Sequence, residues 1–330
     1  MKPFFQKIAN FFLFLKRWLI TLPPVKFIIR GSKRWKPPGF QGIPLFDVVQ
    51  FFYKQVKTVG MSERAAAISF NFVMAIPPSL IFLFTLVPFL PISKQFEFEL
   101  YNLIRNIVPG DENNGAIISF LKDFINKPRN GLLSIGFLLS LLFSSNAMIG
   151  IMRSFDKNYV GFKKRKGLQK RRDALKITLV LFFFVILSIV LLVLQGTVLK
   201  WLGVQNASVR NLINMVRWLL IVILFFTSIS YIYRNAPSVH KKWKFINPGS
   251  ILAAFLMILF TLAFSWWVTN FSNYNELYGS ISAILIVMLL IFFNSLVLMI
   301  GFELNVSINA LKKIADERAA NTPSGKEIPA

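Results

Sequence analysis

A long apolar run near the C-terminus constrains the fold of this chain more than any other feature. Residues 281–300 contain only three polar side chains, Ser282, Asn294 and Ser295. Because an α-helix rises about 1.5 Å per residue, about 20 such residues cover the ~30 Å hydrocarbon core of a bilayer. A polar, aromatic stretch precedes the run, and Gly301-Phe302-Glu303 follows it. The run therefore predicts a transmembrane helix.

Five further apolar runs of spanning length come earlier in the chain. The six predicted spans cover about 65–90, 132–152, 177–199, 212–233, 249–270 and 280–309. The chain is 55% hydrophobic and only 16% charged, whereas soluble domains carry about 25% charged residues. The predicted fold class is therefore all-α, a polytopic membrane protein with a bundle of six transmembrane helices. Pro77-Pro78 lies near the middle of the first span, which predicts a kinked or broken first helix.

The net charge of +24 is distributed unevenly, and the distribution indicates an orientation. If the N-terminus is cytoplasmic, the inner segments are 1–64, 153–176, 234–247 and the tail after 309, and they hold 30 of the 38 Lys and Arg residues. Cytoplasmic segments of membrane proteins are enriched in these residues. We therefore expect both termini in the cytoplasm and anionic lipid headgroups at the basic inner loops. An envelope partner protein is a second candidate partner, and no nucleic acid is expected.

The chain divides into three predicted parts. Residues 1–60 are basic, and apolar residues recur there every three or four positions over 4–20 and again over 45–57. This pattern predicts amphipathic helices at the membrane interface, with a partner-docking arm as the alternative. Residues 61–312 hold the six spans, and residues 313–330 are expected to be a disordered cytoplasmic tail. The loop 91–130 is expected to form two short amphipathic helices, 100–108 and 116–125, on the outer surface.

Several motifs resemble those of one family of bacterial membrane proteins. In the first predicted span the motif is Arg64-Ala65-Ala66-Ala67-Ile68-Ser69-Phe70 with Pro77-Pro78, and at the end of the second it is Ser144-Ser145-Asn146-Ala147-Met148 with Phe155-Asp156-Lys157-Asn158-Tyr159. Before the fifth span it is Tyr231-Ile232-Tyr233-Arg234-Asn235-Ala236-Pro237 with Asn247-Pro248-Gly249. Around the sixth span it is Phe271-Ser272-Asn273-Tyr274-Asn275 with Tyr278-Gly279-Ser280 and Gly301-Phe302-Glu303-Leu304-Asn305. On these residues, from about Glu63 to Asn309, the chain resembles the YihY/BrkB family, formerly described as ribonuclease BN. It departs from the family in its longer amphipathic N-terminus and in Ile291-Phe292-Phe293, where the family tends to have a tryptophan. The resemblance implies six transmembrane helices, a bacterial inner-membrane location, and links to serum resistance and to export of envelope lipid or lipopolysaccharide.

The residues themselves do not support hydrolytic chemistry. The single histidine, His240, lies beside lysines in a predicted loop, the chain has no cysteine, and its 14 acidic residues are scattered. Metal-dependent RNA hydrolysis requires clustered ligands, and the sequence shows neither a nucleophile with its base nor a phosphate-binding P-loop. We therefore expect a protein that is not an enzyme, with no catalytic residue, metal or cofactor.

Two groups of polar residues are candidate sites near or within the membrane. The first is a polar pocket beside the proline pair, formed by Asn71, Ser145, Asn146 and Asn294. Hydrogen bonding between helices is the alternative explanation for these residues. The second is a charge network at the cytoplasmic ends of the spans, formed by Arg64, Arg153, Asp156, Arg234 and Glu303. Because charges at membrane depth are costly, Glu303 is expected to pair with one of the arginines, either as a packing contact or in a substrate or gating role.

A third candidate group lies at the predicted outer mouth. It consists of the aromatic residues Trp266, Trp267, Tyr274 and Tyr278. Such residues form an interfacial belt in many membrane proteins, and a contact with a lipid headgroup or glycan is the alternative. Taken together, the residues and the family resemblance favour transport or export of an envelope lipid or another amphipathic substrate through an opening around the first span. A non-transporting membrane scaffold that recruits partners or anionic lipid is the alternative function.

Overall fold

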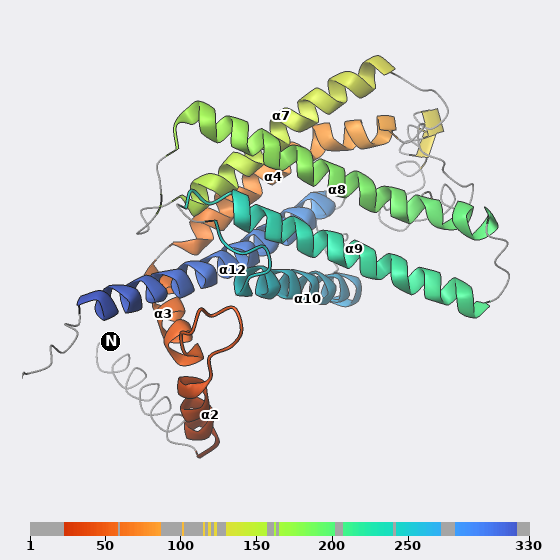
Figure 1. The fold of residues 1–330 in the computed structure, drawn as a ribbon. Helices are drawn as coiled ribbons and strands as arrows, with labels where there is room; N and C mark the ends of the chain where they lie inside the picture. Colours follow the sequence, from red (N-terminus) through yellow and green to blue (C-terminus); the bar gives the residue numbers. More distant parts are fainter. Residues whose placement is uncertain are drawn as a thin grey trace, which may run out of the picture. The chain divides into compact units, whose positions relative to one another are not determined.

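The computed structural model confirms an all-α polytopic fold (Figure 1). It describes residues 23–58, 60–86, 130–156, 165–201, 207–239, 242–271 and 281–321, with isolated positions at 101, 115, 118–119, 122–123 and 162. Six of its helices are long and apolar enough to cross a bilayer. They are α4 (Met61–Leu86), α7 (Asn130–Phe155), α8 (Gly167–Trp201), α9 (Ala207–Asn235), α10 (Pro248–Phe271) and α12 (Ile281–Asn321). The only β contact among these described residues is an isolated bridge between Phe162 and Val239.

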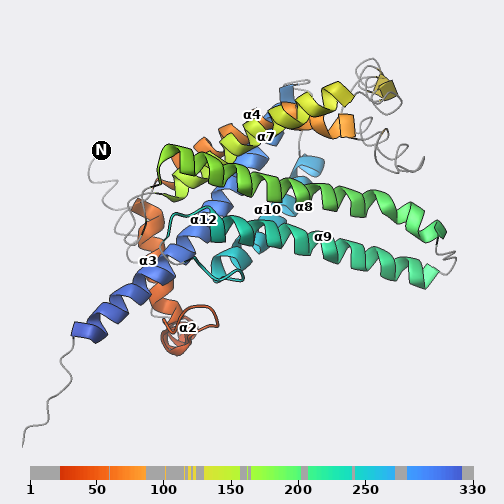
Figure 2. The same cartoon turned by 45° about the horizontal axis from the view of Figure 1, so that its top comes forward.

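The chain folds into two compact units. The larger unit contains residues 60–302, and the smaller unit contains residues 1–59 together with residues 303–330. Within the larger unit, α4 packs along α7, α7 along α8, α8 along α9, and α9 along α10. Figures 1 and 2 show that α8 and α9 run side by side in opposite directions.

Alternating helix directions bring several charged segments of the larger unit to one end. Side-chain contacts join the end of α7 to the start of α8, and the start of α8 to the end of α9. The start of α10 lies against α12 near Gly301. We call this region the basic end, defined as the described residues of 60–64, 153–176, 234–250 and 298–302 of the larger unit.

An aromatic core occupies the basic end. The ring of Phe155 stacks on that of Phe302, with centroids 3.9 Å apart and planes 4° apart. Tyr233 packs edge-on against Phe155 at 5.9 Å, and Trp243 lies 5.6 Å from Phe302. The Tyr233 hydroxyl donates a 2.6 Å hydrogen bond to the Leu298 carbonyl. Residues from α7, α9, α12 and the loop before α10 thus form one packed cluster.

The start of α10 shows why the sequence Asn247-Pro248-Gly249-Ser250 folds as it does. Asn247 Oδ1 accepts a 2.8 Å hydrogen bond from the Ser250 backbone N–H, which is the bond of a helix N-cap. Pro248 takes the first helical position, where its missing N–H costs nothing. Gly301 of α12 allows close contact with this start of α10, because a Cβ on Gly301 would lie 2.5 Å from both the Gly249 carbonyl oxygen and the Tyr233 hydroxyl.

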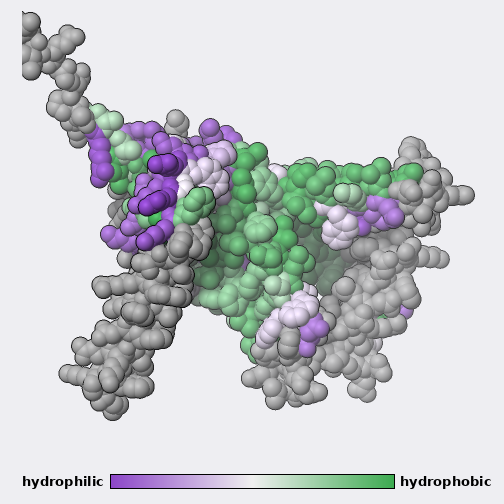
Figure 3. Space-filling model, turned by 90° about the horizontal axis from the view of Figure 1, so that it is seen from below, coloured by the Kyte–Doolittle hydropathy of each residue, from purple (hydrophilic) through white to green (hydrophobic). Residues whose placement is uncertain are grey.

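Large apolar side chains remain exposed along the spans. They include Phe183 on α8, Met215 on α9 and Phe255 on α10. Figure 3 shows a broad hydrophobic surface across the middle of one face. Because soluble proteins rarely expose apolar patches of this extent, these helix faces are suited to contact with acyl chains.

One prediction about the spans is narrowed and one is wrong. The first span was predicted to be kinked or broken, and α4 continues as one helix through Pro77 and Pro78, so it is not broken at this point. α12 extends to Asn321, so residues 313–321 are helical rather than disordered. Side-chain pairs one turn apart support this extension, namely Lys312 with Asp316 at 2.6 Å and Lys313 with Glu317 at 3.8 Å. The remainder of the tail and the two helices predicted within 91–130 lie largely outside the described residues.

The smaller unit contains α2 (Pro23–Arg34), α3 (Leu45–Thr58) and the C-terminal part of α12. The amphipathic helix predicted over 45–57 is confirmed as α3. The segment between α2 and α3 is held by the Leu45 N–H, which donates to the Trp35 carbonyl at 3.0 Å. Gln41 donates to Asn309 Oδ1 on α12 at 3.1 Å. The amphipathic helix predicted over 4–20 lies outside the described residues.

Candidate functional site: a polar pocket between α4 and α7

A polar pocket of about 630 Å³ lies between α4 and α7 at the basic end. Its lining combines arginines and asparagines with small residues. The lining residues are Gly60, Glu63, Arg64, Ala67, Asn71, Asn146, Ile149, Gly150, Arg153 and Ser154.

Helix geometry gives this pocket a cationic end and an amide end. Arg64 precedes Asn71 by two helical turns on α4, and Asn146 precedes Arg153 by the same spacing on α7, a distance of ~10 Å along each axis. Because the two helices run antiparallel, Arg64 near the start of α4 and Arg153 near the end of α7 lie at the same end of the helix pair. Both asparagines lie two turns further from that end. The pocket is therefore lined by two arginines nearer the helix ends and by two asparagines about two turns further along the helices.

Short contacts hold both asparagines in place. Asn71 Nδ2 donates to the Ala67 carbonyl at 2.7 Å, and Gly150 packs against the Asn71 amide, where a Cβ would lie 3.0 Å from Nδ2. Asn146 Oδ1 accepts a hydrogen bond from Arg171 Nη1 on α8. Since an amide has two N–H groups and a carbonyl, this bond leaves the Asn146 amide nitrogen as a donor for a ligand.

The charge of the pocket is positive. Arg64 is only 6% exposed, whereas Arg153 is exposed at the outer end. Arg171 adds a third guanidinium beside Asn146. Glu63 is the one acidic residue among the described residues of the lining. It folds back over Gly60, where a Cβ would lie 2.5 Å from the Glu63 carboxylate and where the φ of 61° favours glycine. This set of donors is suited to an anionic group, since guanidinium groups form strong, directional hydrogen bonds to phosphate and carboxylate.

The predicted polar pocket is brought together only in part. Asn71 and Asn146 share the pocket, but Ser145 is buried and donates to the Leu142 carbonyl at 2.8 Å. Asn294 donates to the Leu290 carbonyl at 3.0 Å and lies 3.4 Å from Thr261 Oγ1 on α10. Ser145 and Asn294 therefore serve helix geometry and helix pairing, which was the alternative explanation for them.

The predicted charge network is also divided. Arg64 and Arg153 line the pocket, whereas Asp156 lies beyond the end of α7 and pairs with Lys170 at 3.1 Å. Arg234 is exposed in the last turn of α9. Glu303 is fully buried and belongs to the smaller unit. Its pairing with an arginine stays a prediction.

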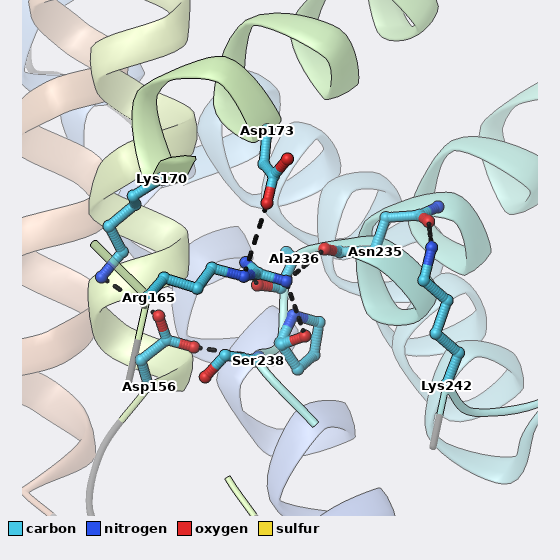
Figure 4. A network of polar contacts seen from close by, with 9 residues as sticks. Asp156, Arg165, Lys170, Asp173, Asn235, Ala236, Ser238 and Lys242 are labelled. Carbon is cyan, nitrogen blue, oxygen red and sulfur yellow. Dashed lines mark hydrogen bonds and ion pairs between the residues drawn. The ribbon is translucent and has the colours of Figure 1, made fainter. Parts of the chain in front are cut away.

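A clamp centred on Arg165 was not predicted as a site (Figure 4). Its guanidinium donates to the carbonyls of Ala236 at 2.8 Å, Pro237 at 3.1 Å and Asn235 at 3.2 Å, and it lies 3.5 Å from Asp173. The Asn235 carbonyl belongs to the last residue of α9 and the other two follow it directly, at the helix end that carries partial negative charge. Asp156 adds a second tie between the same loops, because it accepts the Ser238 N–H at 3.1 Å. The sequence shows Arg165 only as one of four consecutive basic residues, so only its charge was apparent.

The predicted outer-mouth aromatics are described in part. Trp266 is exposed on α10, and Trp267 packs at 5.9 Å from Phe264. Tyr274 and Tyr278 lie outside the described residues. Across the described part of the chain, no group of three or more His, Asp or Glu side chains could hold a metal ion.

Comparison with known proteins places the chain among membrane proteins. YfkH of Bacillus subtilis (strain 168), whose name describes it as ribonuclease-like, is 26% identical over 77% of this chain and 92% of its own length. A UPF0761 membrane protein of Chromohalobacter salexigens is 24% identical over 73% of this chain and 58% of its own length. Another, from Xanthomonas campestris pv. campestris (strain B100), is 21% identical over 84% of this chain and 64% of its own length. No solved structure matches. A family model described as Virulence factor BrkB matches residues 52–326, which confirms the resemblance seen in the motifs. The chain is therefore an integral membrane protein that belongs to the Virulence factor BrkB family.

Proposed function

We propose that this protein binds an anionic, amphipathic lipid at the pocket between α4 and α7 and takes part in moving it across the bacterial inner membrane. The observation that carries the proposal is the order of side chains along the two helices. Arginines line the outer end of the pocket and asparagines lie deeper. The same helix faces then become apolar, because Met74 follows Asn71 by three residues and Leu142 precedes Asn146 by four, and these side chains are 48% and 46% exposed.

This order matches the two parts of a lipid. A phosphate or carboxylate headgroup accepts hydrogen bonds from Arg64, Arg153 and the Asn146 amide. Its acyl chains then extend along Met74 and Leu142 towards the membrane centre. The basic end faces the cytoplasm in this proposal, with both termini on that side, because cytoplasmic segments carry most Lys and Arg residues. The basic loops beside the pocket attract further anionic headgroups to it.

Reconstitution in vesicles tests this function. The full chain is placed in vesicles that contain fluorescent phosphatidylglycerol or fluorescent phosphatidylcholine, and translocation is followed by chemical quenching of the outer leaflet. Arg153→Gln and Asn146→Leu should lower phosphatidylglycerol translocation by about tenfold, the effect of losing one charge-assisted contact. Arg172→Gln is the matched control, because Arg172 is an exposed arginine of the basic end outside the pocket lining. Equal translocation by wild type and both pocket variants would exclude the pocket as the site.

A non-transporting scaffold is the second candidate function. It is favoured by the surface of α2 and the residues just after it, where Phe27 and Trp35 are 78% and 59% exposed among Lys26, Arg30 and Lys33. Aromatic side chains among basic ones bind anionic membrane surfaces. Retention of phosphatidylglycerol on the purified protein, without translocation in vesicles, would favour this function over transport.

A further inference from the structure

A second polar pocket, of about 470 Å³, lies between the first turns of α8 and the end of α9. It is separate from the pocket between α4 and α7, because the described residues that line the two pockets are all different. Its lining consists of Arg165, Gln169, Asp173, Lys176, Ile177, Tyr231, Asn235, Ser238, Val239 and Lys242.

The Arg165 clamp forms one wall of this second pocket. Because the Arg165 guanidinium pairs with Asp173 and with three carbonyls at the end of α9, its charge is compensated within the wall. Asp173, the only acidic residue among the described residues of the lining, is compensated by the same contact. The wall is therefore fixed in shape and adds little net charge.

The uncompensated charge of the pocket comes from two lysines on opposite sides. Lys176 lies on α8 and Lys242 lies in the loop after α9, and both are exposed. Lys242 Nζ donates to Asn235 Oδ1 at 2.9 Å, which holds the ammonium group at the pocket (Figure 4). An ammonium group carries three N–H donors, so this bond leaves two for a ligand. The lining therefore has an excess of positive charge.

Ser238 provides an independent sign that a ligand belongs here. Its side chain is only 3% exposed, and its Oγ has no hydrogen-bond partner among the described residues. Buried hydroxyl groups nearly always have a partner, since an unsatisfied one costs free energy. Ser238 also lines this pocket. A ligand with several acceptor oxygens would satisfy the hydroxyl.

We propose that this second pocket binds a phosphate group, carried either by inorganic phosphate or by a phospholipid headgroup. A phosphate has acceptor oxygens in several directions, which matches donors that come from α8 and from the loop between α9 and α10, namely Lys176, Ser238 and Lys242. Its charge is balanced by Lys176 and Lys242. Occupancy adds a tie between α8 and this loop, beside the tie that Arg165 already makes, so the ligand stabilises the basic end.

Two binding measurements on the detergent-purified full chain test the proposal. Inorganic phosphate is titrated at constant ionic strength, with affinity from calorimetry and stability from thermal unfolding. In the second measurement the chain is placed in nanodiscs of phosphatidylcholine with or without phosphatidylglycerol, and bound lipid is counted by native mass spectrometry. Phosphate binding in detergent identifies the free anion as a ligand, whereas selective retention of phosphatidylglycerol alone identifies the headgroup.

Four variants decide whether the binding occurs at this pocket. Lys242→Gln, Lys176→Gln and Ser238→Ala should each weaken it by about five- to tenfold, the effect of one lost hydrogen bond to a charged ligand. Lys244→Gln is the matched control, because Lys244 is an exposed lysine of the same loop outside the lining. Unchanged affinity in Lys242→Gln and Ser238→Ala, or binding of neither ligand by the wild type, would overturn the proposal.

Discussion

Replacing Gly301 by alanine tests a close contact between α10 and α12 in the larger unit. The added methyl group would lie 2.5 Å from the Gly249 carbonyl oxygen, 2.5 Å from the Tyr233 hydroxyl and 2.8 Å from the Ala253 methyl. Two of these neighbours belong to α10, so α12 and α10 must move apart. Overpacking of this kind costs about 1–3 kcal/mol, and weakening the bond from Tyr233 to Leu298 adds about 1 kcal/mol. Alanine returns about 1 kcal/mol through its higher helix propensity, so we expect a net loss of about 2 kcal/mol.

The loss is measured as the free energy of unfolding in mixed micelles of a mild detergent and sodium dodecyl sulfate. Gly131→Ala is the matched control, because no atom lies within 4 Å of a Cβ at that position of α7. The double variant Gly301→Ala with Tyr233→Phe removes one of the two oxygen contacts and retains the backbone contact, so it should recover only part of the loss attributed to the clash. A Gly301→Ala variant as stable as Gly131→Ala would refute the close contact between α10 and α12.

Three further predictions concern the basic end. Arg165→Gln should lower the free energy of unfolding by about 2–3 kcal/mol, because carbonyls at the end of α9 lose a charged donor. Arg165→Lys should restore only part of this stability, because an ammonium group cannot reproduce the planar set of donors of a guanidinium. Both variants are measured by the same unfolding assay. Gly150→Ala should change the free energy of unfolding by less than about 1 kcal/mol, because the Asn71 side chain can shift. It should nevertheless narrow the pocket between α4 and α7 and so lower the retention of phosphatidylglycerol, which is measured by native mass spectrometry. Asn247→Ala should cost about 1 kcal/mol through loss of the α10 N-cap, whereas Asn247→Asp, which keeps the cap oxygen, should unfold like the wild type in that assay.

The six spans could be predicted from the sequence because the constraint on them is local. Crossing a bilayer requires a continuous apolar stretch, and its length is visible without knowledge of any tertiary contact. The helix ends were harder to predict. Beyond Asn309, α12 is stabilised by pairs one turn apart, Lys312 with Asp316 and Lys313 with Glu317. The polar composition of this segment suggested disorder, although its charge spacing favours a helix. The prolines of α4 indicated a weak point, but nothing local determines whether neighbouring helices keep such a helix continuous.

The candidate site was predicted in part for a related reason. Asn71 and Asn146 come together because two adjacent antiparallel spans place them at the same depth. Ser145 is next to Asn146 in sequence, but successive residues of a helix point about 100° apart, so only one of the two faces the pocket. The roles of Arg165 and Ser238 depend on contacts between loops distant in sequence. In a basic loop, such residues cannot be distinguished from solvated ones before the fold is known.

The Arg165 clamp also bears on how the protein is made. The hydrogen bonds of the Arg165 guanidinium can form only after carbonyls 70 to 72 residues later in the chain have been synthesised. Chains emerge from the ribosome N-terminus first, at about 5–20 residues per second. The third and fourth spans must therefore have been made before this contact can form, and until then Arg165 lacks its contact with the end of α9. A nascent chain halted before residue 235 should consequently be cut readily at the connection between α7 and α8 by a membrane protease, whereas the completed chain should resist cleavage there.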